Sequence, residues 1–263
     1  NRSIHGEAFG WMVAERYEMT SQGEAAERLC DQWELGREDL DAFAVESHRR
    51  ACAAASAGHF EKEIVPVPVM QVREKGAEGE AHLFSADETI RPGTAVEKLA
   101  TLKTSFRADG RLTAGNSSQI SDGAAGLLLM SSVKARSLGL KPRARILAMT
   151  TVGSDPTLML TGPVAATRKV LAQAGLTLDD IDLFEINEAF ASVPLVWMKE
   201  LGVSSERLNV NGGAIALGHP LGASGARIMT SMLHELERRG GRYALQAICC
   251  AGGMGTATLI ERL

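Results

Sequence analysis

The second half of this chain alternates apolar, strand-like runs with stretches of helical periodicity, and this alternation constrains the fold more than any other feature. The apolar run 145–150 precedes a helical pattern that Gly175 ends. The run 181–186 leads into another helical pattern, and the run 243–249 follows a third. Strands that alternate with helices build layered α/β domains. Because the last apolar run, 256–261, follows directly after a glycine-rich turn, we expect the domain to end in two consecutive strands.

The first half mixes helix and strand signals. Residues 23–57 predict two helices, the second with apolar side chains every three to four positions and an end at Gly58. Residues 64–69 alternate apolar side chains with prolines, which is typical of an exposed or edge strand because proline has no N–H for a ladder. The polar stretch 74–80 predicts a hairpin tip or loop. The dense apolar run 122–130 is interpreted as a buried helix or strand of a large core.

Composition excludes several classes of protein. The 263 residues are 45% hydrophobic, so the chain can bury a substantial core. The net charge is −4 with scattered basic residues, which argues against a nucleic-acid partner because phosphate neutralisation needs Lys and Arg on one surface. The sequence contains neither an apolar run of about 18 residues nor a signal-peptide core. We therefore expect a globular, cytoplasmic protein; since it opens on Asn1 rather than Met, its function must allow for further residues.

The four cysteines are Cys30, Cys52, Cys249 and Cys250. They have neither the spacing of zinc ligands nor the density of a disulfide scaffold, so we expect reduced thiols and no metal site. The neighbouring pair 249–250 is also open to interpretation as a redox site, although bridges between adjacent cysteines are strained.

Two segments place a polar, chemically capable residue in a loop beside a predicted strand, where α/β folds usually build their sites. Asn187 directly follows the run 181–186; it can cap the next helix, or it can donate hydrogen bonds and hold a water. His219 lies in the glycine-rich stretch 209–225, whose glycines let a substrate approach the main chain closely. That stretch is either a phosphate-binding loop with a bystander histidine or a pocket with a catalytic imidazole.

A third segment begins at Cys249, at the end of a predicted strand and before the glycine turn 250–255. A buried cysteine taken alone is most often inert packing. Beside a turn that frees backbone N–H groups it acquires a second interpretation, because those amides can form an oxyanion hole.

Together and in this order, the three segments resemble the thiolase family. They read Asn-Glu-Ala-Phe, then Asn-x-Asn-Gly-Gly-Ala-Ile-Ala-x-Gly-His-Pro-x-Gly-Ala-Ser-Gly-Ala-Arg, then Cys-x-x-Gly-Gly-Met-Gly. Residues 37–44 and 113–124 also look like thiolase segments, so the resemblance covers nearly the whole chain from Gly23 onward. It implies a layered α/β/α/β/α fold with an inserted α+β loop domain that covers coenzyme A. Residues 1–118 would be the loop domain with its return segment, and residues 119–263 the C-terminal thiolase domain.

The resemblance also implies catalytic roles. Cys249 would be the acid/base thiol that moves a proton to or from the α-carbon of acetyl-CoA, with its pKa lowered by the turn amides and a nearby imidazole. His219 would activate the nucleophilic cysteine and polarise a thioester oxygen, and Asn187 would hold the water that completes this oxyanion site. The backbone amide of Ala251, at a position where the family usually has glycine, would contribute to the oxyanion hole.

For coenzyme A, the resemblance implies contacts from five residues. Ser118 would contact the pantetheine, and Ala114, Phe106, Ala189 and Phe190 would line its channel. The alternative interpretations are plain packing for the two phenylalanines and a turn hydroxyl for Ser118.

The implied activity is that of an acyltransferase in fatty-acid or related lipid metabolism. It would cleave 3-ketoacyl-CoA with coenzyme A, or run in reverse as a Claisen condensation, with coenzyme A as a substrate and no permanently bound cofactor. The family's nucleophilic cysteine belongs to an N-terminal half that we expect to be absent from this sequence, since neither Cys30 nor Cys52 has a matching glycine-flanked context. Family membership further implies a homodimer or homotetramer.

Two alternatives remain at this level. A non-catalytic thiolase-like subunit that binds acyl-CoA or lipid is disfavoured because Asn187, His219 and Cys249 are all intact. A nucleotide-binding glycine loop is disfavoured because the stretch lacks Gly-Lys-Ser/Thr and no dinucleotide fingerprint opens the chain.

Overall fold

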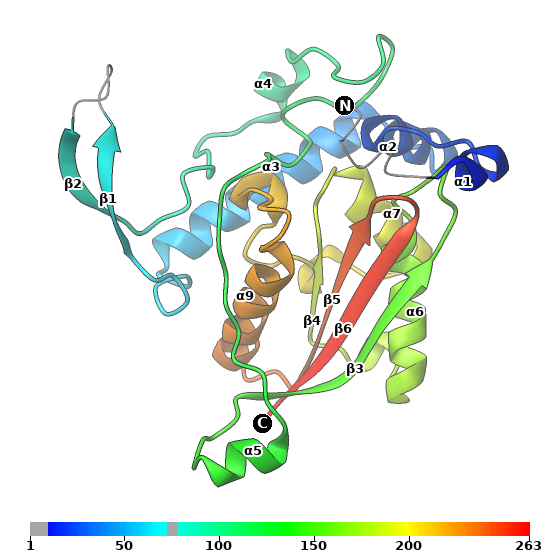
Figure 1. The fold of residues 1–263 in the computed structure, drawn as a ribbon. Helices are drawn as coiled ribbons and strands as arrows, with labels where there is room; N and C mark the ends of the chain where they lie inside the picture. The colour runs from blue at the N-terminus through cyan, green and yellow to red at the C-terminus, as the bar shows by residue number, and fades with distance from the viewer. Residues whose placement is uncertain (1–9, 73–77) are drawn as a thin grey trace.

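The computed structural model describes residues 10–72 and 78–263, and it is built around a four-stranded mixed sheet (Figure 1). The strand order is β3-β6-β5-β4, with β3 at Ala144–Gly153, β4 at Leu183–Ile186, β5 at Tyr243–Cys250 and β6 at Met254–Arg262. The pairs β3–β6 and β5–β6 are antiparallel, whereas β4 runs parallel to β5. The predicted α/β alternation and the two consecutive final strands are confirmed.

Helices cover both faces of this sheet. On one face, α6 (Gly162–Ala174) packs against β3, β5 and β6, with α7 (Ser192–Leu201) beside it. On the other face, α9 (Ser224–Arg239) lies against β4 and β5. Successive side chains of β5 face opposite layers. Ala244 belongs to the cluster under α9, and Leu245 belongs to the main core under α6.

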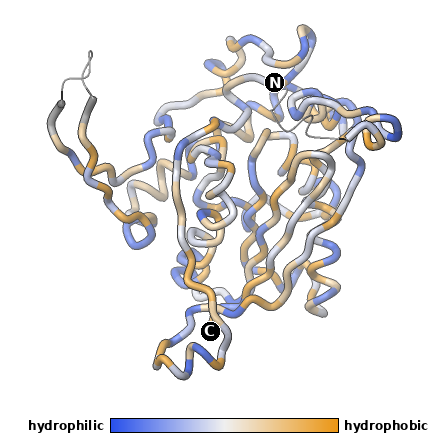
Figure 2. The backbone as a smooth tube through the Cα atoms, viewed as in Figure 1, coloured by the Kyte–Doolittle hydropathy of each residue, from blue (hydrophilic) through white to orange (hydrophobic). Residues whose placement is uncertain are grey.

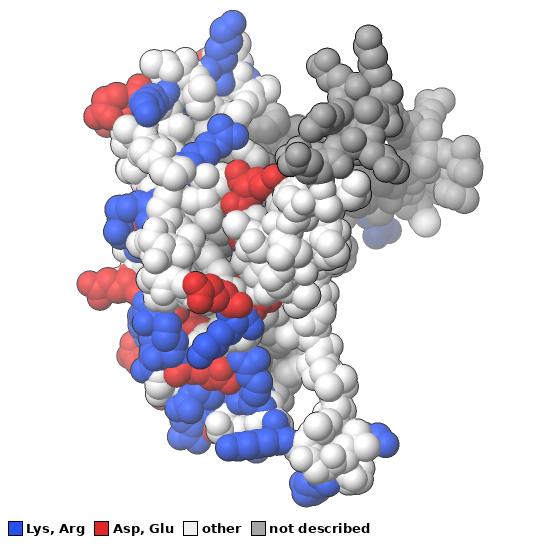
Figure 3. All heavy atoms as spheres, turned by 90° about the vertical axis from the view of Figure 1, so that its left-hand side faces the viewer, with Lys and Arg blue, Asp and Glu red and all other residues white. Residues whose placement is uncertain are grey.

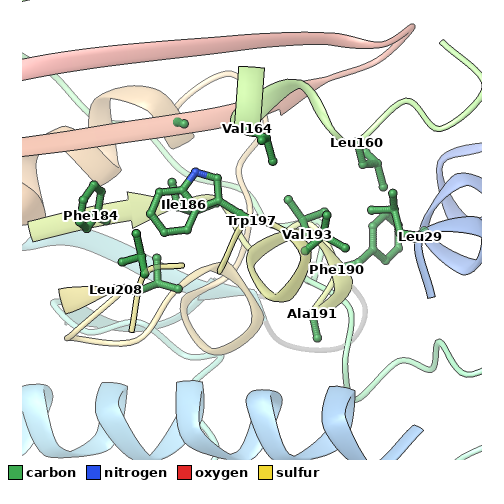
Figure 4. Close-up of a cluster of buried hydrophobic side chains, with 14 of the residues drawn as sticks. Leu29, Leu160, Val164, Phe184, Ile186, Phe190, Ala191, Val193, Trp197 and Leu208 are labelled. Atoms are coloured by element: carbon green, nitrogen blue, oxygen red, sulfur yellow. The ribbon is translucent and has the colours of Figure 1, made fainter. Parts of the chain in front are cut away.

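The main core lies between the sheet, α6, α7 and α2 (Gln22–Gln32), and its centre is aromatic (Figure 4). The rings of Phe184 and Trp197 have their centroids 5.1 Å apart. The buried indole N–H of Trp197 donates to Thr167 Oγ1 at 3.0 Å, so this large side chain is fully buried without an unpaired donor. Leu29 of α2 reaches the same cluster, which fastens the first half of the chain to the sheet layer.

The first half contains the two predicted helices and a hairpin. The elements are α1 (Trp11–Arg16), α2, α3 (Arg37–Ser56), β1 (Val67–Val72), β2 (Glu78–Phe84) and α4 (Val96–Ala100). The hydroxyl of Ser21 caps α2 by accepting from the Glu24 amide, and α3 ends just before Gly58, whose φ of +73° suits glycine. The predicted strand 64–69 begins at Val67 and pairs antiparallel with β2. Of the predicted tip 74–80, residues 74–77 lie outside the described residues and 78–80 belong to β2.

Helix α7 begins later than the sequence indicates. The helical pattern starts near residue 188, but the helix starts at Ser192. Residues 187–191 are held in a loop by the segment 116–118: the Ala191 amide donates to Asn116 O, and the Ser118 amide donates to Ala189 O. Residues 208–210 form isolated bridges, Leu208 with Phe184 and Val210 with Gly212. The second half of the chain also contains short helices. These are α5 (Ser132–Ser137), η2 (Leu178–Asp180), η3 (Ser205–Arg207) and α8 (Ala214–Leu217).

The prediction of a buried element at 122–130 is wrong. This run is part of a strap, residues 119–131, which is extended, crosses over α9 and carries apolar colouring in Figure 2. Leu128 is 80% exposed and Leu129 65% exposed. The physical reason is that no strand within residues 10–72 and 78–263 pairs with the strap, so its apolar side chains have nothing to pack against.

The surface is electrically mixed. Acidic and basic side chains are interspersed on the face shown in Figure 3. Several form ion pairs, among them Arg143–Glu237 at 2.7 Å and Arg242–Glu261 at 2.8 Å. In the part of the chain that the structure describes, no helix is long and apolar enough to cross a membrane. The division of the chain at residues 118 and 119 stays a prediction.

Candidate active site

Asn187 and His219, which are 32 positions apart in the sequence, come together at one end of the sheet. Asn187 leaves β4 and its amide donates to Ala247 O at 3.0 Å, which fixes its position against β5. Its side-chain Nδ2 lies 3.4 Å from His219 Nε2. His219 lies in the loop between α8 and α9, and its amide donates to Gln119 O at 2.9 Å. The sheet end and the glycine loop therefore form one site, and the start of the strap borders it.

The hydrogen bonds around His219 assign its neutral tautomer. His219 Nδ1 is 2.6 Å from Ser224 Oγ, and the Ser224 hydroxyl donates to Pro220 O at 2.9 Å. Because a hydroxyl has one hydrogen, the Ser224 oxygen must accept the Nδ1–H of the imidazole. The lone pair then lies on Nε2, beside the Asn187 amide. Burial lowers the pKa of His219, so the neutral ring is favoured and Nε2 is available as a base.

Two glycines permit the close approach of the loop to its neighbours. Gly218 has a φ of +82°, and a Cβ at this position would lie 2.3 Å from Ser121 Oγ in the strap. A Cβ at Gly213 would lie 2.4 Å from Glu188 Oε1. Both distances are far below van der Waals contact, so the glycines before His219 have a structural cause.

Buried hydrogen bonds of Glu188 and Asn209 join the end of β4 to the glycine loop. Glu188, directly after Asn187, accepts hydrogen bonds from Ser47 Oγ at 2.7 Å, Asn209 Nδ2 at 2.9 Å and the Ile215 amide at 3.1 Å. Asn209, whose φ is +45°, also pairs with both the N–H and the C=O of Ile186 at 2.9 Å. Helix α3, the end of β4 and the glycine loop are thus joined through one carboxyl group. Burial raises the pKa of Glu188, and the three donors oppose that rise.

Cys249 occupies the penultimate position of β5, opposite Gly255 of β6. It packs against the main core, and burial, with the neighbouring Cys250 second, raises the pKa of its thiol to about 12. The expectation of a lowered pKa is therefore wrong. No hydrogen bond within the described residues joins Cys249 to His219, and the apolar surroundings destabilise a thiolate. The resting thiol is protonated and can act as an acid.

The adjacent thiols do not form a redox pair. Cys249 and Cys250 are successive residues of a paired strand, so their side chains point to opposite faces of the sheet. Both are free cysteines. This strand geometry rules out the redox interpretation.

Ala251 opens the turn 251–253 between β5 and β6. Ala251 is exposed. Within the described part of the chain its amide donates no hydrogen bond, so the N–H is available to a ligand. The turn is anchored because the amide and hydroxyl of Ser154 both donate to Gly253 O, at 2.6 and 2.7 Å. A fixed, unpaired amide is the feature that an oxyanion hole requires.

Four of the five predicted coenzyme A contacts lie together. The amide and hydroxyl of Ser118 both donate to Ala189 O at 3.0 Å, and Phe106 meets Phe190 edge to face with ring centroids 5.7 Å apart. Phe106 remains 45% exposed and Phe190 is buried. Ala114 is exposed in the turn that leads to Ser118. Their roles in binding stay predictions.

The sequence alone did not identify the residues that hold the candidate catalytic groups in place. Ser224 was part of the glycine motif, but only the fold reveals that its hydroxyl accepts from His219. Asn209 and Glu188 also lie within the motifs, and only the fold reveals their mutual hydrogen bond. The sequence contains a signal for Glu188, because a carboxyl group between the apolar run 181–186 and Ala189-Phe190 needs buried partners.

The comparisons with known proteins agree with this geometry. Residues 140–262 match the thiolase C-terminal domain and residues 3–133 match the thiolase N-terminal domain. The chain therefore includes part of the N-terminal domain, and the expectation that the whole N-terminal half is absent is wrong to that extent. The crystal structure of the Bacillus anthracis acetyl-CoA acetyltransferase superposes with a TM-score of 0.88 at 42% identity, over 100% of this chain and 68% of that chain. This chain belongs to the thiolase family. Its thiolase-like α/β fold is thereby confirmed.

Curated thiolase relatives carry different substrate names. The acetyl-CoA acetyltransferase of Chromobacterium violaceum is 48% identical over 250 residues, which are 95% of this chain and 62% of the relative. The 3-ketoacyl-CoA thiolase of Cronobacter sakazakii is 50% identical over 245 residues, 92% of this chain and 62% of the relative. This thiolase chain therefore spans less than two thirds of the length of these relatives. Among its described residues, no group of three or more His, Cys, Asp or Glu side chains is placed to hold a metal ion.

Proposed function

We propose that this chain supplies the acid/base part of a thiolase, which cleaves a 3-ketoacyl-CoA with coenzyme A or forms one from two acyl-CoA molecules. The observation that carries the proposal is the joined arrangement of Asn187, His219 and Ser224 at the end of the sheet. It provides donors and a base at one point of the fold, as carbanion chemistry beside a thioester requires.

In this proposal the nucleophilic cysteine comes from residues outside this sequence. The two cysteines of the first half are unsuited: Cys30 is buried with a pKa raised to about 12 by burial, and Cys52 lies within α3. A groove of about 390 Å³ lies between the strap and the residues that follow His219, lined by residues 121–125 and 220–223. The exposed apolar strap at the edge of this groove suits packing against residues outside this sequence.

The proton and electron movements balance with the groups present. His219 Nε2 takes the proton of the nucleophilic thiol. The resulting thiolate sulfur adds to C3 of the 3-ketoacyl-CoA. The C2–C3 bond breaks, its electron pair forms the enolate of acetyl-CoA, and the Cys249 thiol donates its proton to C2. Coenzyme A then takes the acyl group; its thiol proton restores Cys249, and the imidazolium returns its proton to the nucleophile.

The remaining groups stabilise charge in this scheme. The Asn187 amide, with the water it holds, and His219 face one thioester oxygen, and the amide of Ala251 faces a second oxyanion. Ser118, Ala114, Phe106, Ala189 and Phe190 form the coenzyme A channel. The complete enzyme is proposed to be a cytoplasmic homodimer or homotetramer.

The test is steady-state thiolysis by the complete protein with acetoacetyl-CoA and longer 3-ketoacyl-CoA substrates. We expect Cys249→Ala and His219→Ala each to lower kcat by about 10²- to 10⁴-fold, the usual contribution of a positioned acid or base. Cys250→Ala is the matched control, because the Cys250 side chain lies on the other face of β5. The kcat of this variant should stay near that of the wild type. Full activity in either of the first two variants contradicts the proposal. Coenzyme A binding without turnover in the wild type would instead support a non-catalytic binding subunit.

A further inference from the structure

Glu185 is a buried carboxyl group that the proposed reaction does not use. It lies in β4, two residues before Asn187, and is 9% exposed. Its neighbours Phe184 and Ile186 belong to the main core, so the alternation of the strand turns Glu185 toward α9. Within the described residues no hydrogen bond reaches its carboxyl group. A buried carboxyl without a partner is costly, so this position calls for a physical explanation.

A small cavity lies directly beside this carboxyl group. It measures about 30 Å³, enough for one or two waters, and its lining includes Glu185, Asn187, Ser224 and Arg227. Asn187 is 2% exposed, and its Oδ1 has no hydrogen-bond partner in the described part of the chain. The Nδ2 of the same amide faces His219. One space therefore adjoins an unpaired carboxyl group and an unpaired amide oxygen.

The charges around this cavity favour a neutral Glu185. Arg227 on α9 is the nearby cation, but its guanidinium is committed to Asp87 through bonds of 2.6 and 2.8 Å. The other ionisable groups that face this region are Glu188 after β4, Glu63 after α3, and His234 and Glu235 on α9. Burial first, and then the acidic neighbours, raise the pKa of Glu185 well above its usual range. The neutral acid has an O–H to donate.

We propose that Glu185 is a positioning residue whose carboxyl group holds Asn187 Oδ1 through a water in this cavity, and so fixes the Asn187 amide beside His219. The inference rests on the proposed role of Asn187 in oxyanion stabilisation. Neutral Glu185 donates to the water, the water donates to Oδ1, and the Nδ2 hydrogens are left for His219 and the reacting oxygen. An Asn side chain without this anchor can rotate about its terminal torsion, which is soft.

The kinetic test uses the complete protein with two substitutions of Glu185. Glu185→Gln keeps the size and an N–H donor but cannot ionise, whereas Glu185→Leu removes the hydrogen bond. We expect Glu185→Gln to keep kcat within about two-fold and Glu185→Leu to lower kcat by about 10²-fold with little change in KM, because misplacement of a catalytic group costs rate rather than binding. The matched control is Gln246→Leu, which removes a buried polar group from the facing position of β5 that does not line the cavity.

The pH profile separates positioning from a merely structural role. Wild-type kcat should fall on the alkaline side as Glu185 ionises and stops donating, and Glu185→Gln should remove that fall. Equal kcat in wild type and Glu185→Leu overturns the proposal. So does an equal loss in Glu185→Gln and Glu185→Leu, since the donor would then be irrelevant.

Two readouts are independent of thiolase activity. A high-resolution crystal structure should contain a water within about 3.2 Å of both the Glu185 carboxyl group and Asn187 Oδ1. Because the folded-state pKa of Glu185 is raised, its stabilising contribution is complete below its unfolded pKa and is lost as pH rises through the folded pKa. Stability of the wild type should therefore fall with rising pH more steeply than that of Glu185→Gln. An inactive wild type contradicts the proposed function; a cavity without the water, or parallel pH–stability curves, contradicts the role of Glu185.

Discussion

Strand β4 and the strap are both apolar runs, yet they have opposite fates. All four residues of β4, Leu183–Ile186, are buried, with β5 on one side and α6, α7 and α9 in the layers around them. Residues 124–130 of the strap are at least as apolar, and most of them are exposed. The difference is the neighbour: β4 has strand and helix partners, whereas the backbone hydrogen bonds and bridges that hold the strap to other described residues lie near residues 119–121. An apolar run therefore predicts a need for burial, and the partner decides whether that need is met.

The largest difference between the two regions should appear on truncating one large side chain in each. Phe184→Ala removes a fully buried ring from the main core and should cost about 3–5 kcal/mol of unfolding free energy. Leu128→Ala in this chain should change it by less than about 0.5 kcal/mol, because Leu128 is 80% exposed. Urea unfolding of the two variants measures both values. Similar costs would mean that the strap is packed in this chain.

Adding the residues outside this sequence should reduce the contrast. If the complete protein covers the strap as proposed, Leu128→Ala should there cost about 2–5 kcal/mol, the usual range for a buried Leu. The measurement is the same urea titration on the complete protein, with Leu138→Ala, directly after α5, as a second exposed site for comparison. A cost that stays below about 0.5 kcal/mol would show that the strap is not covered there.

Glycine substitutions provide a smaller and more local comparison. A Cβ at Gly255 in β6 would lie 2.4 Å from the backbone of Gly162 at the start of α6, so Gly255→Ala should cost about 1–3 kcal/mol through overpacking. Gly126 in the strap has nothing within 4 Å of the same position. Gly126→Ala should therefore leave the melting temperature nearly unchanged. Calorimetry on both variants measures the difference, and a neutral Gly255→Ala would show that the contact between β6 and α6 is loose.

The smallest expected effect is a charge placed on the strap. Leu128→Lys should shift unfolding free energy by less than about 0.5 kcal/mol in this chain, since the side chain already faces solvent. Self-association should decrease, because an exposed apolar, unpaired segment favours contact between molecules. Sedimentation velocity at several concentrations measures this. Unchanged self-association would mean that molecules contact one another through a surface other than the strap.

Much of the fold was predictable because its signals are local. Gly175 and Gly240 end α6 and α9 with positive φ, and Met232 and Leu236, which are four positions apart, lie on the buried face of α9. The site was predictable in part for a different reason: the family motifs name Asn187, His219 and Cys249 in order. The meeting of Asn187 with His219 depended on a glycine loop whose path no local pattern describes.

The sequence alone determined the α/β alternation, the chain order of the final strands and the thiolase resemblance, since these depend on periodicity, turn residues and residue identity. Only the tertiary structure decided the tautomer of His219, the raised pKa of Cys249 and the exposure of the strap. The reason is that a proton's position, a thiol's charge and an apolar side chain's burial all depend on the groups that surround them. For His219 these groups are Ser224 and Pro220 in the same loop, for Cys249 they are the core around β5 and the adjacent Cys250, and the strap has no strand partner among the described residues.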